Sequence, residues 1–328
     1  MTSVLIIGGA GMIGAKLTAR LVKDGAVAGK AIDAVTLADV IAAKVPEGAP
    51  FRVESRAVDL SAAGAAEGLV ASRPDFIFHL AAILSGESET DFDKGYRVNL
   101  DGTRMLFEAI RKVGDGYKPR LVFSSSIAVF GAPFPEAIGD EFFHTPLTSY
   151  GTQKAIGELL LADYTRRGFM DGIGIRLPTI CVRPGKPNKA ASSFFSGIIR
   201  EPLAGQEAIL PVAETVRHWH ASPRAAIGFL VHAAGLDGAK LGDRRNLSLP
   251  GVSATVGEQI AALEKVTGAA VARRIRHEPD PFIQRIVAGW ARNFAPQQAL
   301  ALGFRAEKDF EEIIRVHIAD ELGGTWVH

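Results

Sequence analysis

The sequence has very little of what marks a secreted or membrane-embedded protein. Its 328 residues include a single cysteine, Cys181, so no disulfide can form within the chain. Its apolar runs are far shorter than the ~20 residues needed to span a bilayer, and its N-terminus lacks the basic stretch of a secretory signal peptide. We therefore expect a soluble protein of the reducing cytoplasm.

An excess of charge of one sign is also lacking. The chain carries 37 basic and 36 acidic residues, a formal net charge of +1, and has no long run of either sign. This balance argues against nucleic acid and against an anionic membrane surface as partners, and it leaves small molecules. With 47% hydrophobic residues, the chain can bury a large core.

A glycine-rich turn stands near the N-terminus. Residues 4–7 are apolar and mostly β-branched, which predicts a buried strand, and Gly8, Gly11 and Gly14 then lead into a helical pattern. Such glycines allow a tight turn, close approach of a pyrophosphate and close packing of helix on strand. The phosphates would lie at the helix N-terminus, beside Met12 and Ile13. A glycine turn without a ligand is the alternative, because glycine marks many turns.

The next strand supports the nucleotide interpretation. Residues 34–38 are apolar and β-prone, and they end on Asp39. An acidic residue there hydrogen-bonds the adenosine ribose hydroxyls and repels the 2′-phosphate of NADP. Lys44 is the nearest cation, and no arginine directly follows Asp39. The sequence therefore predicts NAD as the cofactor.

Strands and helices alternate along the first 180 residues with the spacing of a parallel sheet. This pattern predicts an α/β fold, a Rossmann-type doubly wound parallel sheet. We expect residues 1–180 to form the NAD-binding domain, with return segments within 205–245, and residues 181–328 to form a smaller, mostly helical substrate-binding lobe interleaved with it. The further strands are expected at 52–58, 75–82, 121–126 and 173–178, and the helices at 61–72, 92–113 and 149–167. Later helices should begin at Ser192-Ser193, at Ser222-Pro223, at a Thr255–Glu258 capping box and at Phe310.

Tyr150 and Lys154 lie one helical turn apart, after a strand that ends in three serines. Hydride transfer from a carbinol requires a base for the hydroxyl proton. A tyrosine, with a pKa of about 10, is a poor base near neutrality, whereas a nearby lysine favours the phenolate. The spacing alone is weak evidence, since a packed tyrosine and a solvated lysine would look the same, but its position after the predicted NAD turn favours the catalytic interpretation.

Together these features resemble the extended short-chain dehydrogenase/reductases of the NAD-dependent epimerase/dehydratase family. The resemblance covers the first 180 residues. It implies that Ser126 is the catalytic serine, Tyr150 the acid/base and Lys154 its partner. The cofactor-binding residues it implies, besides the glycine turn and Asp39, are Asp59, Leu60, Leu80, Ala81, Ala82, Asn99, Ser124, Tyr150, Lys154 and Pro178.

The family also implies a homodimer in which the helices at 92–113 and 149–167 pair. The second of these helices carries apolar side chains that form a wide surface: Ile156, Leu159, Leu160, Leu161 and Tyr164.

Departures from the family pattern narrow the reaction. Dehydratases carry Thr-Asp-Glu where this chain has Ser126-Ile127-Ala128, so no acidic pair is present to expel a hydroxyl, and we exclude dehydration. Sugar-nucleotide epimerases carry an asparagine that contacts the diphosphate where this chain has Thr179. A clamp for a nucleotide sugar is therefore in doubt.

A site for a smaller anion replaces it. Arg183, Asn188 and Ser192 place hydrogen-bond donors around a predicted helix N-terminus, which suits a carboxylate. Together with Ser126, Tyr150 and Thr179 they form the expected substrate site. The sequence segments around Thr179, Arg183 and Ser192 resemble those of the D-erythronate dehydrogenases of the same superfamily. This resemblance implies oxidation of a four-carbon sugar acid at C2. The alternative is that the arginine and serines only cap loops and helices.

Three functions stay open from the sequence: a sugar-acid dehydrogenase, a nucleoside-diphosphate-sugar 4-epimerase, and a non-catalytic NAD-sensing or scaffold protein. The intact set of Ser126, Tyr150 and Lys154 argues against the third. His218 and His220 have no acidic or cysteine neighbours at metal-ligand spacing, so we expect a structural role for them and no metal site.

Overall fold

The computed structural model describes residues 1–185 and 191–327. These residues form two compact units, each built from three separate stretches of the chain. The first unit contains residues 1–129, 148–176 and 227–247, and the second contains residues 130–147, 177–226 and 248–328. The returning segment 227–247 overlaps the range expected from the sequence, whereas residues 130–147, expected in the first part, pack with the second unit.

The first unit is built on a seven-stranded sheet with the order β13-β9-β7-β6-β1-β4-β5. The four pairings from β5 to β7 are all parallel, which confirms the predicted Rossmann-type fold. Its strands are β1 (Ser3–Ile7), β4 (Ala34–Asp39), β5 (Arg52–Ala57), β6 (Phe76–His79), β7 (Arg120–Ser126), β9 (Asp171–Leu177) and β13 (Asn246–Ser248), with a small hairpin of β2 (Ala26–Val27) and β3 (Lys30–Ala31).

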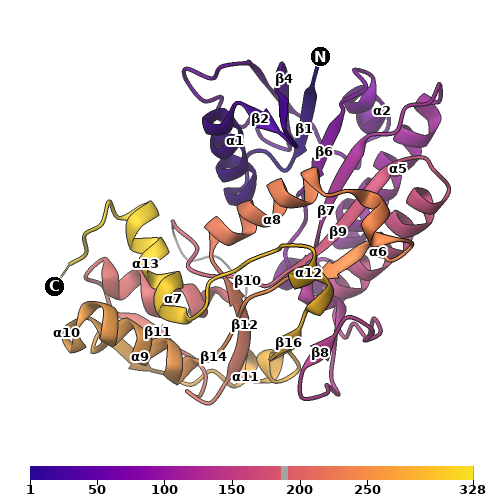
Figure 1. Ribbon diagram of the computed structural model, residues 1–328. Coiled ribbons are helices and arrows are strands. Elements are labelled where there is room, and N and C mark those ends of the chain that lie inside the picture. The colour runs from indigo at the N-terminus through magenta and orange to yellow at the C-terminus, as the bar shows by residue number, and fades with distance from the viewer. Residues whose placement is uncertain (186–190, 328) are drawn as a thin grey trace. The chain divides into compact units, whose positions relative to one another are not determined.

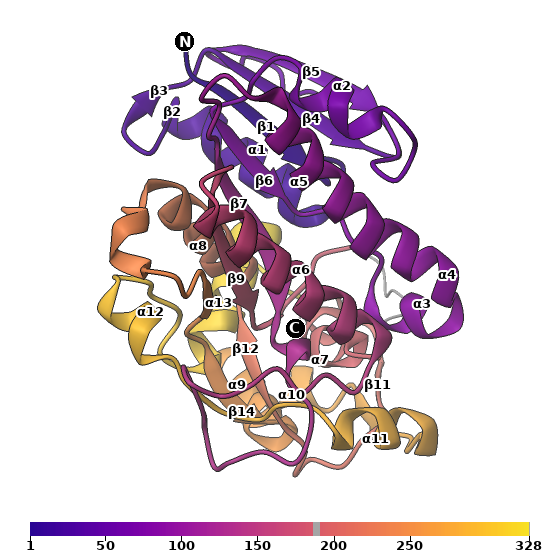
Figure 2. The same cartoon turned by 90° about the vertical axis from the view of Figure 1, so that its right-hand side faces the viewer.

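Helices cover both faces of this sheet. α1 (Met12–Asp24) and α8 (Pro223–Gly235) lie on one face, and α2 (Ala65–Val70), α5 (Gly102–Val113) and α6 (Ser149–Arg166) lie on the other (Figures 1 and 2). Apolar side chains of β1, β6 and β7 pack against α2, α5 and α6 in one buried cluster. The remaining helical segments are α3 (Ser85–Thr90), α4 (Phe92–Gly95), the π-helical η1 (Tyr96–Asp101) and the 3₁₀ turns η2 (Ile127–Val129) and η3 (Gly238–Leu241).

The strand order reverses between β1 and β6. The chain leaves β1, adds β4 and β5 on one side, and then returns to add β6 on the other side of β1. Open α/β sheets bind ligands outside the carboxyl ends of the strands at such a switch point. The glycine turn follows β1 and residues 80–84 follow β6, so both segments border this point.

Three predicted elements differ from those observed. The helix expected at 61–72 spans only α2, because the Ser61 backbone N–H and hydroxyl both donate to the Asp59 carboxylate and hold a turn there. The fourth strand ends at His79, so residues 80–82 are loop. The helix expected at 92–113 is continuous in path but changes to π-helical geometry in η1 (Figure 2).

The second unit holds a three-stranded sheet of β10 (Thr179–Ile180), β12 (Arg217–Ala221) and β14 (Val252–Thr255). Two further strand pairs are β11 (Ala208–Leu210) with β15 (Ile275–His277), and β16 (Phe294–Ala295) with β8 (Ile138–Gly139). Its helices are α7 (Ser193–Leu203), α9 (Val256–Thr267), α10 (Ala269–Ala272), α11 (Pro281–Ala288), α12 (Gln297–Ala301) and α13 (Phe310–Glu321).

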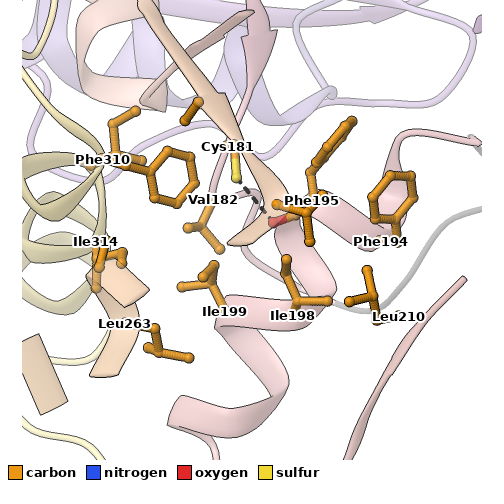
Figure 3. Packing of buried hydrophobic residues seen from close by; sticks show 14 of the residues in the cluster. Cys181, Val182, Phe194, Phe195, Ile198, Ile199, Leu210, Leu263, Phe310 and Ile314 are labelled. Atoms are coloured by element: carbon orange, nitrogen blue, oxygen red, sulfur yellow. Dashed lines mark hydrogen bonds between the residues drawn. The ribbon is translucent and has the colours of Figure 1, made fainter. Parts of the chain in front are cut away.

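The core of the second unit forms around α7. Phe194, Phe195, Ile198 and Ile199 of this helix lie in one buried cluster with residues of α9 and α13 (Figure 3). Cys181 belongs to this cluster, where its thiol donates to the Phe195 carbonyl oxygen at 3.2 Å. Burial raises the pKa of this thiol to about 12. The cysteine is therefore an inert core residue.

The expected helix starts are found, with one difference in capping. The Thr255–Glu258 capping box is complete, and the Ser222 hydroxyl accepts from the Ala225 N–H at the start of α8. Ser192 stands at the N-cap of α7, but its side chain makes no capping hydrogen bond. Within the described ranges, no helix has the length and apolar character needed to cross a membrane.

Candidate active site

Packing within the protein explains two of the three glycines of the turn. Gly8 has φ +94°, and a Cβ there would lie 2.7 Å from the Ala81 nitrogen. A Cβ at Gly14 would overlap the carbonyl oxygen of Gly8. Gly11 differs, because a Cβ at this residue would meet only the Gly8 oxygen, at an ordinary 3.4 Å. Internal packing thus explains Gly8 and Gly14, whereas the open space at Gly11 fits the approach of an external group.

Asp39 joins the end of β4 to this turn. Its carboxylate accepts from the Ala10 N–H at 3.0 Å and from the Val40 N–H at 2.8 Å. Helix α1 begins at Met12, and its N-cap residue is Gly11, which has no side chain to cap the first turn. The first turn of α1, including Ile13, therefore presents backbone N–H groups beside a half-buried carboxylate, an arrangement that fits a dinucleotide.

The loop after β6 is held from two sides. The N–H groups of Leu80 and Ala81 both donate to the Ile7 carbonyl oxygen, at 2.8 and 3.0 Å. Three residues along, the Asn99 amide accepts from the Ile83 N–H at 2.7 Å and donates to the Ile83 oxygen at 3.0 Å. Residues 80–83, which include Ala82, are thereby fixed at the switch point.

Asn99 also contacts the helix that carries Tyr150. Its amide nitrogen lies 2.7 Å from Oε1 of Gln153, and Asn99 itself is 3% exposed. The side chain therefore holds Ile83 and Gln153 in place, and its expected direct contact with a cofactor stays a prediction. Of the other expected adenine neighbours, Asp59 is exposed and Leu60 lies in the buried cluster beneath α2.

The three serines at the end of β7 alternate between the two faces of the sheet. Ser124 and Ser126 are half-buried on one face, whereas Ser125 is buried on the other and donates to Glu158 at 2.5 Å. The Ser124 hydroxyl donates to the His79 carbonyl oxygen at 3.0 Å. The Ser126 hydroxyl accepts from the Ala128 N–H at 3.1 Å, so its own proton can be given to another acceptor.

Helix α6 places Lys154 against the same strand. Its ammonium donates to the Ser124 carbonyl oxygen at 2.8 Å and lies 5.8 Å from the ring centre of Tyr150. Lys154 is 2% exposed, and this burial lowers its pKa to about 7, an effect that the Glu158 charge partly opposes. The structure thus brings Ser124, Lys154 and Tyr150 together within the first unit, next to Ser126.

Sequence reasoning missed the charged pair below Lys154. Glu158, one turn further along α6, forms a buried ion pair with Arg176 of β9 at 2.7 Å. With the Ser125 bond, this carboxylate connects α6 to β7 and β9. The signal was an arginine within an otherwise apolar strand, which requires a buried partner.

The expected substrate residues Thr179, Arg183 and Ser192, and Pro178, all belong to the second unit. The Arg183 guanidinium donates to the Ile180 oxygen at 3.2 Å and lies 3.4 Å from the Ser192 hydroxyl, at the start of α7. Asn188 lies outside the described residues. Thr179 contacts His218, a pairing that the sequence did not suggest.

His218 and His220 lie inside the second unit. Both are buried, which lowers the pKa of His218 to about 4 and that of His220 well below its usual value. Throughout the part of the chain that the structure describes, no three His, Cys, Asp or Glu side chains are grouped to hold a metal ion.

Comparison with known proteins identifies a matching family. The NAD dependent epimerase/dehydratase family matches residues 4–222, from β1 to the residue before α8. The chain belongs to this family. It is similar to the D-erythronate dehydrogenase of Cupriavidus necator, with 47% identity across 97% of this chain and 98% of that protein. The D-erythronate dehydrogenase of Haemophilus influenzae is 44% identical across 96% of this chain and 98% of its own length.

A solved structure is also similar over the whole chain. The crystal structure of the nucleoside-diphosphate-sugar epimerase from Agrobacterium tumefaciens superposes with a TM-score of 0.97 and 66% identity, and the match covers 99% of this chain and 95% of that one. Family membership accounts for the fold, whereas these relatives carry two different functional names.

Proposed function

We propose that this protein is an NAD-dependent dehydrogenase that oxidises the C2 hydroxyl of a short sugar acid such as D-erythronate. The observation that carries the proposal is the similarity to two D-erythronate dehydrogenases along nearly their full length. Support from the chain itself comes from the retained serine, tyrosine and lysine and from Arg183 beside an N-cap whose serine makes no capping bond.

NAD fits the residues of the first unit. Gly8, Gly11 and Gly14 would lie under the pyrophosphate, with Met12 and Ile13 supplying N–H groups, and Asp39 would bind the adenosine ribose. When bound, NAD supplies a hydride acceptor. The remaining proposed neighbours of the cofactor are Asp59, Leu60, Leu80, Ala81, Ala82, Asn99, Ser124, Tyr150, Lys154 and Pro178.

Residues of the chain would carry out the proton transfer. Tyr150 takes the proton from the C2 hydroxyl as the hydride leaves. Ser126 donates a hydrogen bond to the same oxygen, since its own oxygen already accepts from Ala128. Lys154, with its pKa lowered to about 7 by burial, is partly protonated at neutral pH. Its charged form stabilises the Tyr150 phenolate, and the bond to the Ser124 carbonyl oxygen fixes its position.

The proposed substrate anchor lies in the second unit. Arg183, Ser192 and Asn188 would bind the carboxylate, and Thr179 would bind a more distant group of the substrate. A carboxylate is favoured there because a guanidinium and the N–H groups at the start of α7 are its natural partners.

The second candidate is a nucleoside-diphosphate-sugar 4-epimerase. The Agrobacterium structure bears that name, and an epimerase would use the same Ser126, Tyr150 and Lys154. The two functions separate in one assay. We expect NADH absorbance to appear with NAD and D-erythronate, and no calorimetric binding of UDP. Micromolar binding of UDP, with no NADH from any short sugar acid, would show that the epimerase assignment is correct.

We further propose a cytoplasmic homodimer that pairs helices α4, η1 and α5 (residues 92–113) with α6 (149–167). One expected contact residue needs correction: Leu161 is fully buried inside its own unit. Leu159, which is 60% exposed, remains for the interface, with Ile156, Leu160 and Tyr164 half-buried beside it.

A further inference from the structure

The His218 ring is held rigidly in the second unit. It is stacked on Phe195, with ring centres 5.2 Å apart and planes 8° from parallel, and Trp290 lies 5.2 Å away on a tilted plane. The ring is 3% exposed. It can therefore neither rotate freely nor exchange its hydrogen bonds with water.

The two ring nitrogens of His218 have different partners. Nδ1 lies 2.8 Å from the carbonyl oxygen of Ala291, and Nε2 lies 2.6 Å from the hydroxyl oxygen of Thr179. A carbonyl oxygen can only accept, so Nδ1 must carry the proton. In the neutral ring Nε2 is then an acceptor, and the Thr179 hydroxyl must donate to it. Burial keeps the ring neutral by lowering its pKa to about 4.

Thr179 lies next to the proposed carboxylate anchor in the second unit. The Arg183 guanidinium donates to the carbonyl oxygen of Ile180, the residue that follows Thr179, at 3.2 Å, and it lies 3.4 Å from the Ser192 hydroxyl. Thr179 itself is half-buried. The proposed anchor and Thr179 are therefore connected through adjacent backbone positions of one unit.

We propose that His218 is a positioning residue that makes Thr179 a hydrogen-bond acceptor only, so that Thr179 selects a hydroxyl group of the substrate. With its proton held by His218, the Thr179 oxygen can receive an O–H but cannot donate to a carboxylate or a phosphate. This inference rests on the proposed sugar-acid dehydrogenase and refines it: the carboxylate goes to Arg183, and a C3 or C4 hydroxyl goes to Thr179. It also gives a physical reason for poor binding of a nucleotide diphosphate, whose oxygens only accept.

Deoxy substrates test the hydroxyl contact. The enzyme is assayed by NADH absorbance with D-erythronate and with its 3-deoxy and 4-deoxy analogues. One analogue should lose about 5- to 50-fold in kcat/KM with wild-type enzyme, because the Thr179 oxygen, covered by the bound substrate, is left unpaired. Thr179→Val should remove that difference between substrate and analogue, whereas Thr179→Ser should retain it. If Thr179→Val lowers kcat/KM for the substrate and for the analogue by the same factor, so that the difference between them persists, the proposal is overturned. The absence of any difference in the wild type would also overturn it.

The tautomer is tested without turnover. Nitrogen-15 NMR of histidine-labelled enzyme distinguishes a protonated from a bare ring nitrogen, and the His218→Phe variant assigns the signal. We expect Nδ1 protonated and Nε2 bare at neutral pH. A proton on Nε2 would overturn the proposal. If no short sugar acid yields NADH, the proposed function fails and the claim of hydroxyl selection fails with it, whereas the NMR result still decides the state of Thr179.

Discussion

Single residues in the candidate site are held mainly by backbone atoms. Lys154 binds a carbonyl oxygen, Asp39 two N–H groups and Asn99 both backbone atoms of Ile83. The sequence predicted which residue types stand at the site, because their spacing follows from the local geometry of helix and strand. It did not predict the pairs Glu158–Arg176 and Thr179–His218, since these join segments whose register only the fold sets.

We expect Asp39 to determine the choice of cofactor. Replacing it with alanine would remove the proposed charge-assisted bond to the ribose and also the link between β4 and the glycine turn. We expect NAD affinity to fall about 10- to 100-fold, measured by fluorescence titration. The wild type should prefer NAD over NADP, and equal turnover with both cofactors would contradict the assignment.

Arg183 and Tyr150 should give opposite kinetic patterns. Arg183→Ala removes the proposed carboxylate anchor, so kcat/KM for D-erythronate should fall about 10- to 150-fold through KM, with little change in NAD affinity. Tyr150→Phe removes the proton acceptor and should abolish most turnover while both ligands still bind. Titration of each variant with NAD is the control. A fall in kcat alone for Arg183→Ala would rule out its anchoring role.

Among whole elements, α6 has the most roles. One side of the helix carries Tyr150, Lys154 and the buried Glu158, and Leu159 is exposed to solvent. The sequence predicted this helix to within one residue at its end, because its N-cap residue and apolar spacing are local. It did not predict which apolar side chains would be buried: Leu161 packs inside, which depends on the tilt of the helix against the sheet.

The proposed dimer can be tested at Leu159. A glutamate here would place a charge within the interface, so Leu159→Glu should shift the protein from dimer to monomer by light scattering at micromolar concentration. Phe282→Glu is the matched control, because Phe282 is equally exposed, at 60%, but lies on α11. It should leave the mass unchanged. A wild-type monomer would refute the dimer altogether.

Over the whole molecule, alternating strands and helices were enough to predict the parallel sheet and its flanking helices. The packing of residues 130–147 with the second unit was not predictable from the sequence. Their partners lie about 155 residues away in the sequence, as in the pairing of Ile138 and Gly139 with Phe294 and Ala295. The short strands of the second unit were missed for the same reason.

Three of the four histidines that are buried in the described residues make the stability of the molecule sensitive to acid. Burial lowers the pKa of His79 to about 3, that of His218 to about 4 and that of His220 well below 6.5. Unfolded histidines take up protons near pH 6.5, so between pH 6.5 and 5 the unfolded state binds more protons than the folded state. The free energy of unfolding should therefore decrease as the pH is lowered, by at most about 1.4 kcal/mol per pH unit for each histidine.

The thermal midpoint, measured from pH 7 to pH 5, checks this prediction. Glu108, whose pKa is lowered to about 2 mainly by its hydrogen bond from Arg111, loses its contribution mostly below pH 5, so it has little effect in this window. A midpoint that stays constant or rises on acidification would show that the histidines are not buried in their neutral form.

The central claim is net hydride transfer from C2 of a sugar acid, and isotope transfer tests it most directly. D-erythronate carrying deuterium at C2 is incubated with NAD and the enzyme, and the reduced cofactor is analysed by mass spectrometry. The account predicts one deuterium in each NADH, formed in equal amount to the oxidised acid, and a slower rate than with unlabelled substrate. Unlabelled NADH, or deuterium returned to the sugar without net NADH, would contradict it.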